Sequence, residues 1–223
     1  MSVSAAMAGN SASIAASDED AAWVSVDLPL PSGELFASLQ HLERLFGLNP
    51  YLEIESWQEE NPGQLYLGKQ VRLESVNEMN GLRQSATLTV TGLQPGASFT
   101  LDYAGGLKQA TVVSVQELAP SSSRLVVKDC YPAQIDAVER EARVGEVDKS
   151  LVPWGAAIRG YFLGRVRWGW LPFYGWFQER FWLKMPPRQR RIARLIIWTT
   201  ALEFVVFLFV FIIYWLELGR GHL

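Results

Sequence analysis

The segment Lys69 to Leu93 reads KQVRLESVNEMNGLRQSATLTVTGL and decides the fold. Apolar and polar residues alternate on both sides of its Asn-Gly dipeptide, which is a strong signal for a tight turn between two antiparallel strands. In the second arm, Leu88 and Val90 alternate with threonines. We therefore predict a β-hairpin over this segment.

Five further segments before and after the hairpin have strand patterns and are bounded by Pro, Gly, Asn or Ser residues. They are residues 23–28, 51–58, 97–103, 108–117 and 124–131. With the hairpin they make seven strands joined by short, turn-rich connections. This arrangement predicts a curved antiparallel sheet.

Two segments have the apolar spacing of helices. The first covers residues 34–46, and the second runs from about residue 146 to 168. The charged residues 136–144 before the second fit either a short helix or a linker. One face of the long helix carries Trp154, Ile158, Tyr161, Phe162 and Val166.

The order strand, helix, six strands, long helix resembles the START-related, polyketide-cyclase-like superfamily (SRPBCC). Its helix-grip fold, an α+β fold, wraps a curved antiparallel sheet around a long C-terminal helix. The resemblance covers about residues 23–168. It implies a hydrophobic cavity between sheet and last helix, of the kind used for lipids, sterols, quinones or polyketides, and it supplies no shared catalytic set. The local resemblance is carried by Leu35-Phe36, His41-Leu42-Glu43-Arg44 and Asn49-Pro50 leading to Trp57.

The residues expected to line such a cavity are Trp154, Ile158, Phe162, Phe99 and Tyr103. Common catalytic, phosphate-binding and metal-binding motifs are missing, so we predict no cofactor, no metal and no assigned catalytic residue.

Five residues keep open alternatives. Lys128, Asp129 and Tyr131 on the last strand could serve acid–base chemistry, although a solvent-facing Lys128 and an Asp129 near a turn is the simpler interpretation. His41 fits a solvated or capping position better than a general base. Cys130, the single cysteine, fits a small core residue better than a reactive thiol, and it excludes an internal disulfide.

The C-terminal part contains LIIWTTALEFVVFLFVFIIYWL from Leu195 to Leu216, in which Thr199, Thr200 and Glu203 are the only non-apolar residues. As a helix this run is about 33 Å long, enough to cross a hydrocarbon core of about 30 Å. The alternative, a buried core helix, seldom runs so far without a polar stripe.

The flanks of this run predict its orientation. Lys184 and four arginines precede it, whereas Arg220 is the only fixed positive charge after it, so the N-terminal side should be cytoplasmic. Between residues 169 and 187, aromatic rings mix with cations, as at lipid headgroup depth. We expect an interfacial helix over 172–185, unless these rings cover the domain's own core. The residues expected to face the membrane are Trp170, Trp176, Trp182, Arg188, Arg191, Arg194, Trp198, Glu203 and Trp215.

Glu203 is an acid inside an apolar run, which marks a helix-pairing or functional candidate. Thr199 and Thr200 lie on the same helix face. A homo-oligomer formed through this helix is therefore one prediction, and a Glu203 carboxylate that reaches headgroups or water is the alternative.

Charge is divided unevenly along the chain. Residues 1–150 carry net −10 and residues 151–223 carry net +7. The acidic half should face cytosol and the basic half anionic lipid, and nucleic acid is excluded as a partner because the cations are interleaved with Trp and Phe. The N-terminus lacks the pattern of a signal peptide, and the Ala/Ser-rich residues 1–20 should be disordered.

The sequence thus predicts five regions: a disordered segment 1–20, a START-like domain 21–168, an interfacial segment 169–187, a basic region with a transmembrane helix 188–218, and a short tail 219–223. The expected function is a membrane-anchored module that binds a hydrophobic ligand such as a lipid, quinone or polyketide-like molecule. The expected place is the cytoplasmic face of a bacterial inner membrane. A cyclase- or hydratase-like enzyme and a ligand-free scaffold are the alternatives, and a cavity below about 300 Å³ would favour the scaffold.

Overall fold

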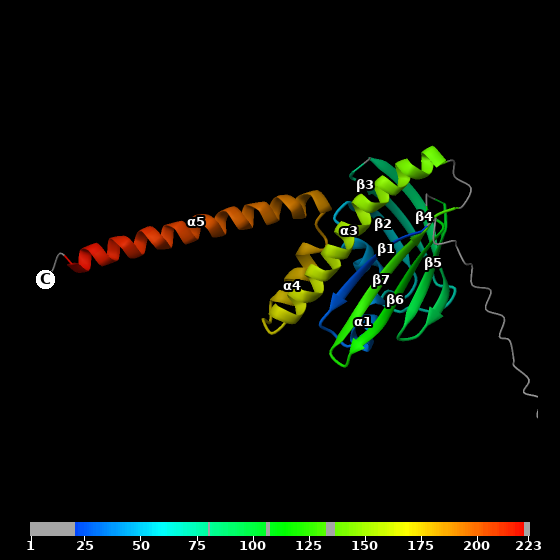
Figure 1. The fold of residues 1–223 in the computed structure, drawn as a ribbon, viewed down its shortest axis with the longest axis horizontal. Coiled ribbons are helices and arrows are strands. Elements are labelled where there is room, and N and C mark those ends of the chain that lie inside the picture. The colour runs from blue at the N-terminus through cyan, green and yellow to red at the C-terminus, as the bar shows by residue number, and fades with distance from the viewer. Residues whose placement is uncertain (1–20, 80, 106–107, 133–136, 221–223) are drawn as a thin grey trace, which may run out of the picture.

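The computed structural model describes residues 21–79, 81–105, 108–132 and 137–220. The segment 1–20, Asn80 of the hairpin turn and the end of the tail lie outside the described residues. Within the described part, a curled sheet packs against helices, and one long helix extends away from this domain (Figure 1).

Seven antiparallel strands form one sheet in the order β1-β7-β6-β5-β4-β3-β2. The predicted hairpin is β3–β4, in which Leu73 lies opposite Ala86. All seven predicted strands are therefore confirmed, with ends that shift by at most two residues. The strands are β1 Ala21–Leu28, β2 Leu52–Glu59, β3 Gln70–Asn77, β4 Leu82–Gln94, β5 Ser98–Ala104, β6 Ala110–Ala119 and β7 Ser122–Cys130.

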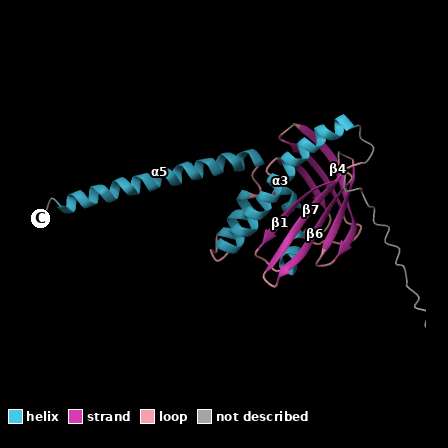
Figure 2. Ribbon diagram, viewed as in Figure 1, coloured by secondary structure: helices cyan, strands magenta, loops and turns pink. Residues whose placement is uncertain are grey.

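The helices divide between the domain and the C-terminal part (Figure 2). Two short ones connect β1 to β2, which lie at opposite ends of the sheet order, and a long one follows β7. The helical elements are α1 Ser32–Leu39, α2 Leu42–Gly47, α3 Ala137–Trp168, α4 Tyr174–Phe177, the π-helical turn η2 Gln178–Trp182 and α5 Pro187–Arg220.

The helix predicted over 34–46 is divided into α1 and α2 by His41. The backbone of His41 has φ −83° and ψ 85°, which is not helical. The Arg44 guanidinium donates to the carbonyl of Ser38 at 2.6 Å, so a carbonyl freed by the break keeps a partner. The apolar spacing continues across the break, which is why the sequence pattern alone predicts one helix.

The long helix α3 packs on β1 at close range. Gly155 permits this approach, because a Cβ atom there would lie 2.5 Å from Cγ2 of Val24. Trp154, Ile158 and Phe162 are buried on the same face of α3. The Trp154 indole N–H also donates to the carbonyl of Leu45 at 2.9 Å, which ties α3 to α2.

Candidate functional site

The inner face of the curled sheet changes from apolar to polar along its length. On β3 the inward residues change from the apolar Val71 and Leu73 to the polar Ser75 and Asn77. On β4 they change in the opposite direction along the chain, from the polar Gln84 to the apolar Ala86 and Leu88. Neighbouring strands are antiparallel, so these polar positions gather at one end of the sheet. The same end carries Tyr103 of β5, Thr111 of β6 and Asp129 of β7.

Four of these side chains form what we call the polar cluster: Tyr103, Lys108, Thr111 and Asp129. The ammonium of Lys108 lies 2.5 Å from one oxygen of the buried Asp129. The other oxygen accepts a hydrogen bond from the Thr111 hydroxyl at 2.6 Å. The single Thr111 proton is used there, so the Tyr103 hydroxyl, 2.9 Å away, donates to Thr111.

Burial and pairing keep the cluster in fixed protonation states. Burial disfavours the charge of Lys108, but the facing Asp129 carboxylate, together with Tyr103 and Tyr131, outweighs this and raises the pKa of Lys108. Burial also raises the pKa of Tyr103 to about 12 and raises that of nearby Tyr131. These three groups therefore do not titrate near neutral pH.

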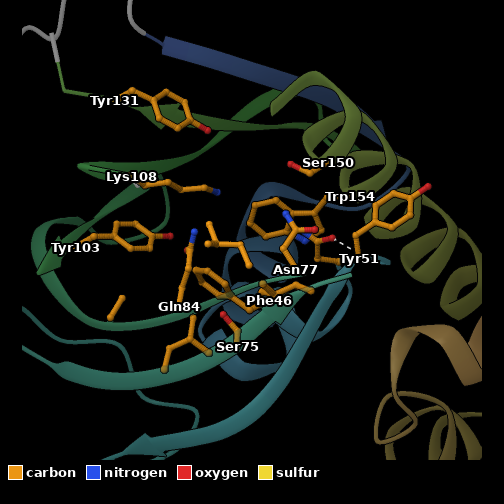
Figure 3. Close-up of a pocket in the computed structure, with 15 residues that line it drawn as sticks. Phe46, Tyr51, Ser75, Asn77, Gln84, Tyr103, Lys108, Tyr131, Ser150 and Trp154 are labelled. Atoms are coloured by element: carbon orange, nitrogen blue, oxygen red, sulfur yellow. Dashed lines mark hydrogen bonds between the residues drawn. The ribbon is translucent and has the colours of Figure 1, made fainter. Parts of the chain in front are cut away.

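A cavity of about 110 Å³ opens beside the polar cluster. In Figure 3, Lys108 and Tyr103 reach into it from one side, while Phe46 and Trp154 close the other. The Lys108 ammonium lies 5.8 Å from the centroid of the Trp154 ring. The lining thus combines aromatic rings with polar groups. It comprises Phe46, Asn49, Tyr51, Leu52, Leu73, Ser75, Asn77, Leu82, Gln84, Ala86, Tyr103, Lys108, Tyr131, Ser150 and Trp154.

The structure separates the five expected cavity residues into two groups. Trp154 and Tyr103 line the cavity. Ile158, Phe162 and Phe99 lie instead in the packed core at the apolar end of the sheet. An edge contact between Phe99 and Phe36, with centroids 6.3 Å apart, shows how tightly that end is filled.

The last strand differs from the simple interpretation of its polar residues. Asp129 is only 1% exposed and belongs to the polar cluster, because its place in the alternation of β7 puts it on the inner face with Leu125 and Val127. Tyr131 lines the cavity. Cys130 is buried and not in a disulfide.

The rim of the cavity is fastened to the start of α5. Tyr51 lines the cavity, and its ring lies 5.4 Å from the Arg191 guanidinium carbon. Arg191 donates to the carbonyl of Pro50 at 2.5 Å and pairs with the Glu78 carboxylate. The other oxygen of Glu78 accepts from the backbone N–H of Arg188 at 3.0 Å, where it caps the helix.

We predict that Glu78→Gln loosens the first turn of α5. The substitution removes a charge-assisted bond to Arg191 and weakens the cap at Arg188, which together contribute on the order of 1 kcal/mol because Arg191 is partly exposed. Hydrogen–deuterium exchange of residues 187–191 in the full-length protein should accelerate by about fivefold. Glu74→Gln changes an exposed position on the same hairpin and should leave this exchange unchanged. An equal response to both substitutions would show that Glu78 does not hold the first turn of α5.

The residues expected to face the membrane occupy three settings. Trp170 and Trp176 are well exposed, whereas Trp182 is half-buried with Arg194 over its ring at 5.9 Å. Arg191 contacts the domain as described above. The other five lie along α5 and are exposed, namely Arg188, Arg194, Trp198, Glu203 and Trp215.

The predicted interfacial helix is shorter and less regular than expected. It consists of α4 and the π-helical turn η2, and its aromatic rings mainly contact one another. Phe181 meets Trp176 edge-on at 5.1 Å and stacks with Phe177 at 6.0 Å. Gly175 lies inside the predicted segment and gives a helical pattern there little support.

Helix α5 contains one candidate membrane span, Pro187–Leu218. None of its apolar window is buried against the described part of the domain, in contrast to a core helix. The Thr199 hydroxyl donates to the carbonyl of Leu195 on the same helix at 3.0 Å. Pairing of helices through Glu203 stays a prediction.

A wide open cleft of about 770 Å³ lies between α1–α2 and the η2 region. His41, Arg44 and Glu179 are among its lining residues. Burial, and then the charge of Arg44, lowers the pKa of His41. Three cations and three carboxylates are among its lining residues, so it does not offer the apolar surface that a hydrophobic ligand needs. Among the described residues, no group of three His, Cys, Asp or Glu could hold a metal ion.

Comparison with known proteins identifies the fold. No protein-family model and no curated protein sequence matches this chain. The Zhui aromatase/cyclase from Streptomyces sp. R1128 superposes with a TM-score of 0.52 at 15% identity, over 66% of this chain and 95% of that one. A START superfamily protein from Mycobacterium smegmatis gives 0.46 at 19% identity, over 64% and 96%. Major latex-like protein 151 from Panax ginseng gives 0.46 at 12%, over 64% and 97%.

Each of these matches covers about two thirds of this chain. At such low identity the likeness to the aromatase/cyclase shows a shared architecture. The element order predicted from the sequence agrees with it. The domain that precedes the apolar C-terminal helix therefore has the helix-grip fold of the START-related, polyketide-cyclase-like proteins.

Proposed function

We propose that the protein is a single-pass membrane protein whose helix-grip domain binds one small amphipathic molecule. The polar end of that molecule would contact the polar cluster, and its apolar part would lie against Phe46 and Trp154. The observation that carries this proposal is the fastening of the cavity rim to α5 through Tyr51, Glu78 and Arg191. A ligand exchanged at this rim would travel little distance through water, which costs about 0.8 kcal/mol per exposed CH₂ group.

The size of the cavity limits what it accommodates. At about 110 Å³ it is smaller than the roughly 300–1,000 Å³ of typical ligand sites. It fits the polar end of a ligand, while a long apolar chain would have to extend past Leu52 and Leu82 at the rim. The same volume favours the second candidate, a scaffold whose interior is filled by its own side chains.

The polar cluster also bears on the enzyme alternative. A general acid or base works best with a pKa near the operating pH. Lys108 and Tyr103 have pKa values raised far above neutrality. Lys108 supplies a fixed positive charge and N–H donors beyond the one used for Asp129, whereas the Tyr103 hydroxyl, whose proton goes to Thr111, is left to accept. This combination suits recognition of a carbonyl, carboxylate or hydroxyl group better than proton transfer.

The proposed membrane placement follows from charge and exposure. The cations at the start of α5 put the domain on the cytoplasmic side by the positive-inside tendency. The exposed rings of Trp170 and Trp176 would lie at headgroup depth on that side. A bacterial inner membrane is the proposed location, with membrane lipids as partners.

The ligand test uses full-length protein purified in mild detergent and analysed by native mass spectrometry. We expect one small molecule per chain, released on unfolding. Ser75→Leu fills part of the cavity from β3 and should lower occupancy at least tenfold, because the added side chain takes the space of the ligand's polar end. Glu74→Leu puts the same side chain on the outer face of β3 and should retain the ligand. Absence of any bound molecule from the wild-type protein would instead support the scaffold.

A further inference from the structure

A second, smaller pocket of about 90 Å³ lies where β2 meets the start of α5. We call it the Arg190 pocket. Its wall combines backbone and side chains of the segment 183–187 with β2 and the first turns of α5. Two of its lining residues are cations, Lys184 and Arg190, and one is an acid, Glu53.

Arg190 is a charged residue in a buried position. It is only 8% exposed, and its Nε atom is buried without a hydrogen-bond partner among the described residues. Glu53 lines the same pocket, yet no ion pair joins it to Arg190 within the described part of the chain. A buried guanidinium donor without an acceptor is costly, so a site of this kind points to an acceptor supplied from outside the chain.

The neighbouring arginines of α5 are engaged elsewhere. Arg191 contacts Glu78 and Pro50 of the domain, and Arg194 lies over the Trp182 ring. The side chain of Arg188 is exposed and does not line the pocket. The two cations left to serve a ligand in the pocket are therefore Arg190 and Lys184.

The depth of the pocket relative to the apolar run identifies the class of ligand. Arg190 precedes Leu195 by five residues, which corresponds to about 7 Å along a helix axis. The headgroup layer on each side of a hydrocarbon core is roughly 5–8 Å thick. If α5 spans the membrane with its apolar run in the hydrocarbon, Arg190 lies at the level of the lipid phosphates.

We propose that the Arg190 pocket binds the phosphate group of a membrane phospholipid through Arg190 and Lys184. A guanidinium offers two parallel N–H donors that match two phosphate oxygens. Lys184, an exposed residue that also lines the pocket, adds an ammonium. The pocket adjoins the wide cleft, with which it shares Gly47, Ile54, Leu183 and Lys184, so a headgroup has an open route to it.

This site rests on the proposed membrane anchoring but is separate from the ligand cavity. With Glu78 holding Arg188 and Arg191, a phosphate bound to Arg190 in the same turn of α5 would fix the height of the domain above the bilayer. Glu53 sets a limit on affinity, because it adds a carboxylate to the lining of the same pocket.

The experiment uses the full-length protein in mild detergent, titrated with phosphatidylglycerol and followed by native mass spectrometry. Diacylglycerol, which has the same chains and no phosphate, and inorganic phosphate are titrated in parallel. We expect one retained phosphatidylglycerol, with Arg190→Gln weakening its binding by about tenfold or more. Arg188→Gln removes the same charge from the same helix outside the pocket and should change binding less than twofold.

Two further variants keep the result interpretable. Lys184→Gln changes an exposed side chain, so it should fold normally and still weaken binding by about threefold. Glu53→Gln should strengthen it by a similar factor, because a carboxylate of the pocket lining is removed. Near-ultraviolet circular dichroism of each variant checks that the domain remains folded.

Three outcomes would overturn the proposal. Equal losses in Arg190→Gln and Arg188→Gln would mean unspecific attraction of anionic lipid. Equal retention of diacylglycerol would mean that the phosphate is not recognised. Saturation by inorganic phosphate without preference for the lipid would assign the pocket to a free anion. Flotation with vesicles is a separate measurement. A protein that does not float with vesicles refutes the membrane anchoring. A protein that floats but binds phosphatidylglycerol and diacylglycerol equally refutes only this site.

Discussion

Phe207→Arg combined with Phe211→Arg is expected to transfer the protein from the membrane fraction to the soluble fraction. The two rings stack at i and i+4 on α5, with centroids 6.3 Å apart, so the substitution places both charges on one face in the middle of the apolar run. Each arginine near the helix centre costs about 3 kcal/mol of insertion free energy.

The balance of insertion free energy explains the size of this effect. The run Leu195 to Leu216 contains 15 Leu, Ile, Val or Phe residues, whose insertion contributes on the order of −6 kcal/mol. Glu203 offsets at most about 3 kcal/mol of this. Two arginines add about 6 kcal/mol, which makes insertion unfavourable and shifts partitioning by roughly 10⁴-fold.

Alkaline extraction of membranes, followed by blotting of both fractions, measures this partitioning. Phe207→Leu with Phe211→Leu serves as control, since it changes the same positions and keeps the run apolar. The control should remain in the membrane. A double-arginine variant that resists extraction as well as the wild type would mean that α5 is held by protein contacts, and it would refute the span.

The sheet could be predicted because its signals are local. The alternation in β3 and β4 and the turn residues between the strands fix the hairpin. The break at His41 could not be predicted, since the apolar spacing of α1 continues into α2. The turn there is stabilised by Arg44 and its hydrogen bond to Ser38, a contact that spacing does not encode.

The polar end of the cavity was within reach of the sequence but was missed. Continuing the apolar alternation of β3 to its end places Ser75 and Asn77 on the inner face, and the same step on β7 places Asp129 there. What the sequence could not show is the partner of Asp129. Lys108 precedes β6 in a loop, so its approach to Asp129 depends on how β6 pairs with β7.

The contacts between α5 and the domain were equally hidden. The sequence pattern identifies Arg188 and Arg191 as members of a cationic flank, with nothing to separate them from their neighbours. Their contacts with Glu78 arise because β3 ends beside the start of α5, 110 residues away along the chain from Arg188. Long-range contacts of single side chains therefore set the site, while local pattern sets the fold.

Asp129→Asn is expected to destabilise the domain by about 3 kcal/mol or more. The substitution leaves the Lys108 ammonium, which is 28% exposed at its side chain, facing a neutral amide in a mostly buried setting. Removing one partner of such a pair typically costs about 3–5 kcal/mol, because the remaining charge has lost its counterion. The Thr111 hydroxyl also loses its charged acceptor.

Thermal unfolding of the full-length protein in detergent measures the loss. A domain of this size should lose roughly 6–12 °C in Tm for 3 kcal/mol. The raised pKa of Lys108 adds a pH criterion. A group whose pKa is higher in the folded state than its ordinary value of 10.5 contributes its full stability below that pH and loses it only as the pH rises above it. The Lys108 contribution to the difference between wild type and Asp129→Asn should therefore stay constant from pH 7 to 9.

Two matched variants separate the buried pair from a general effect of charge. Asp27→Asn removes the carboxylate of the exposed pair with Arg124 and should leave Tm close to that of the wild type. Lys108→Met combined with Asp129→Leu removes both charges at once and should recover most of the lost stability, since no buried charge is left unpaired. A double variant as unstable as Asp129→Asn would show that the ion pair itself contributes the stability, and that the cost does not come from an unpaired Lys108 ammonium. The recognition role proposed for Lys108 would then have to be tested apart from folding.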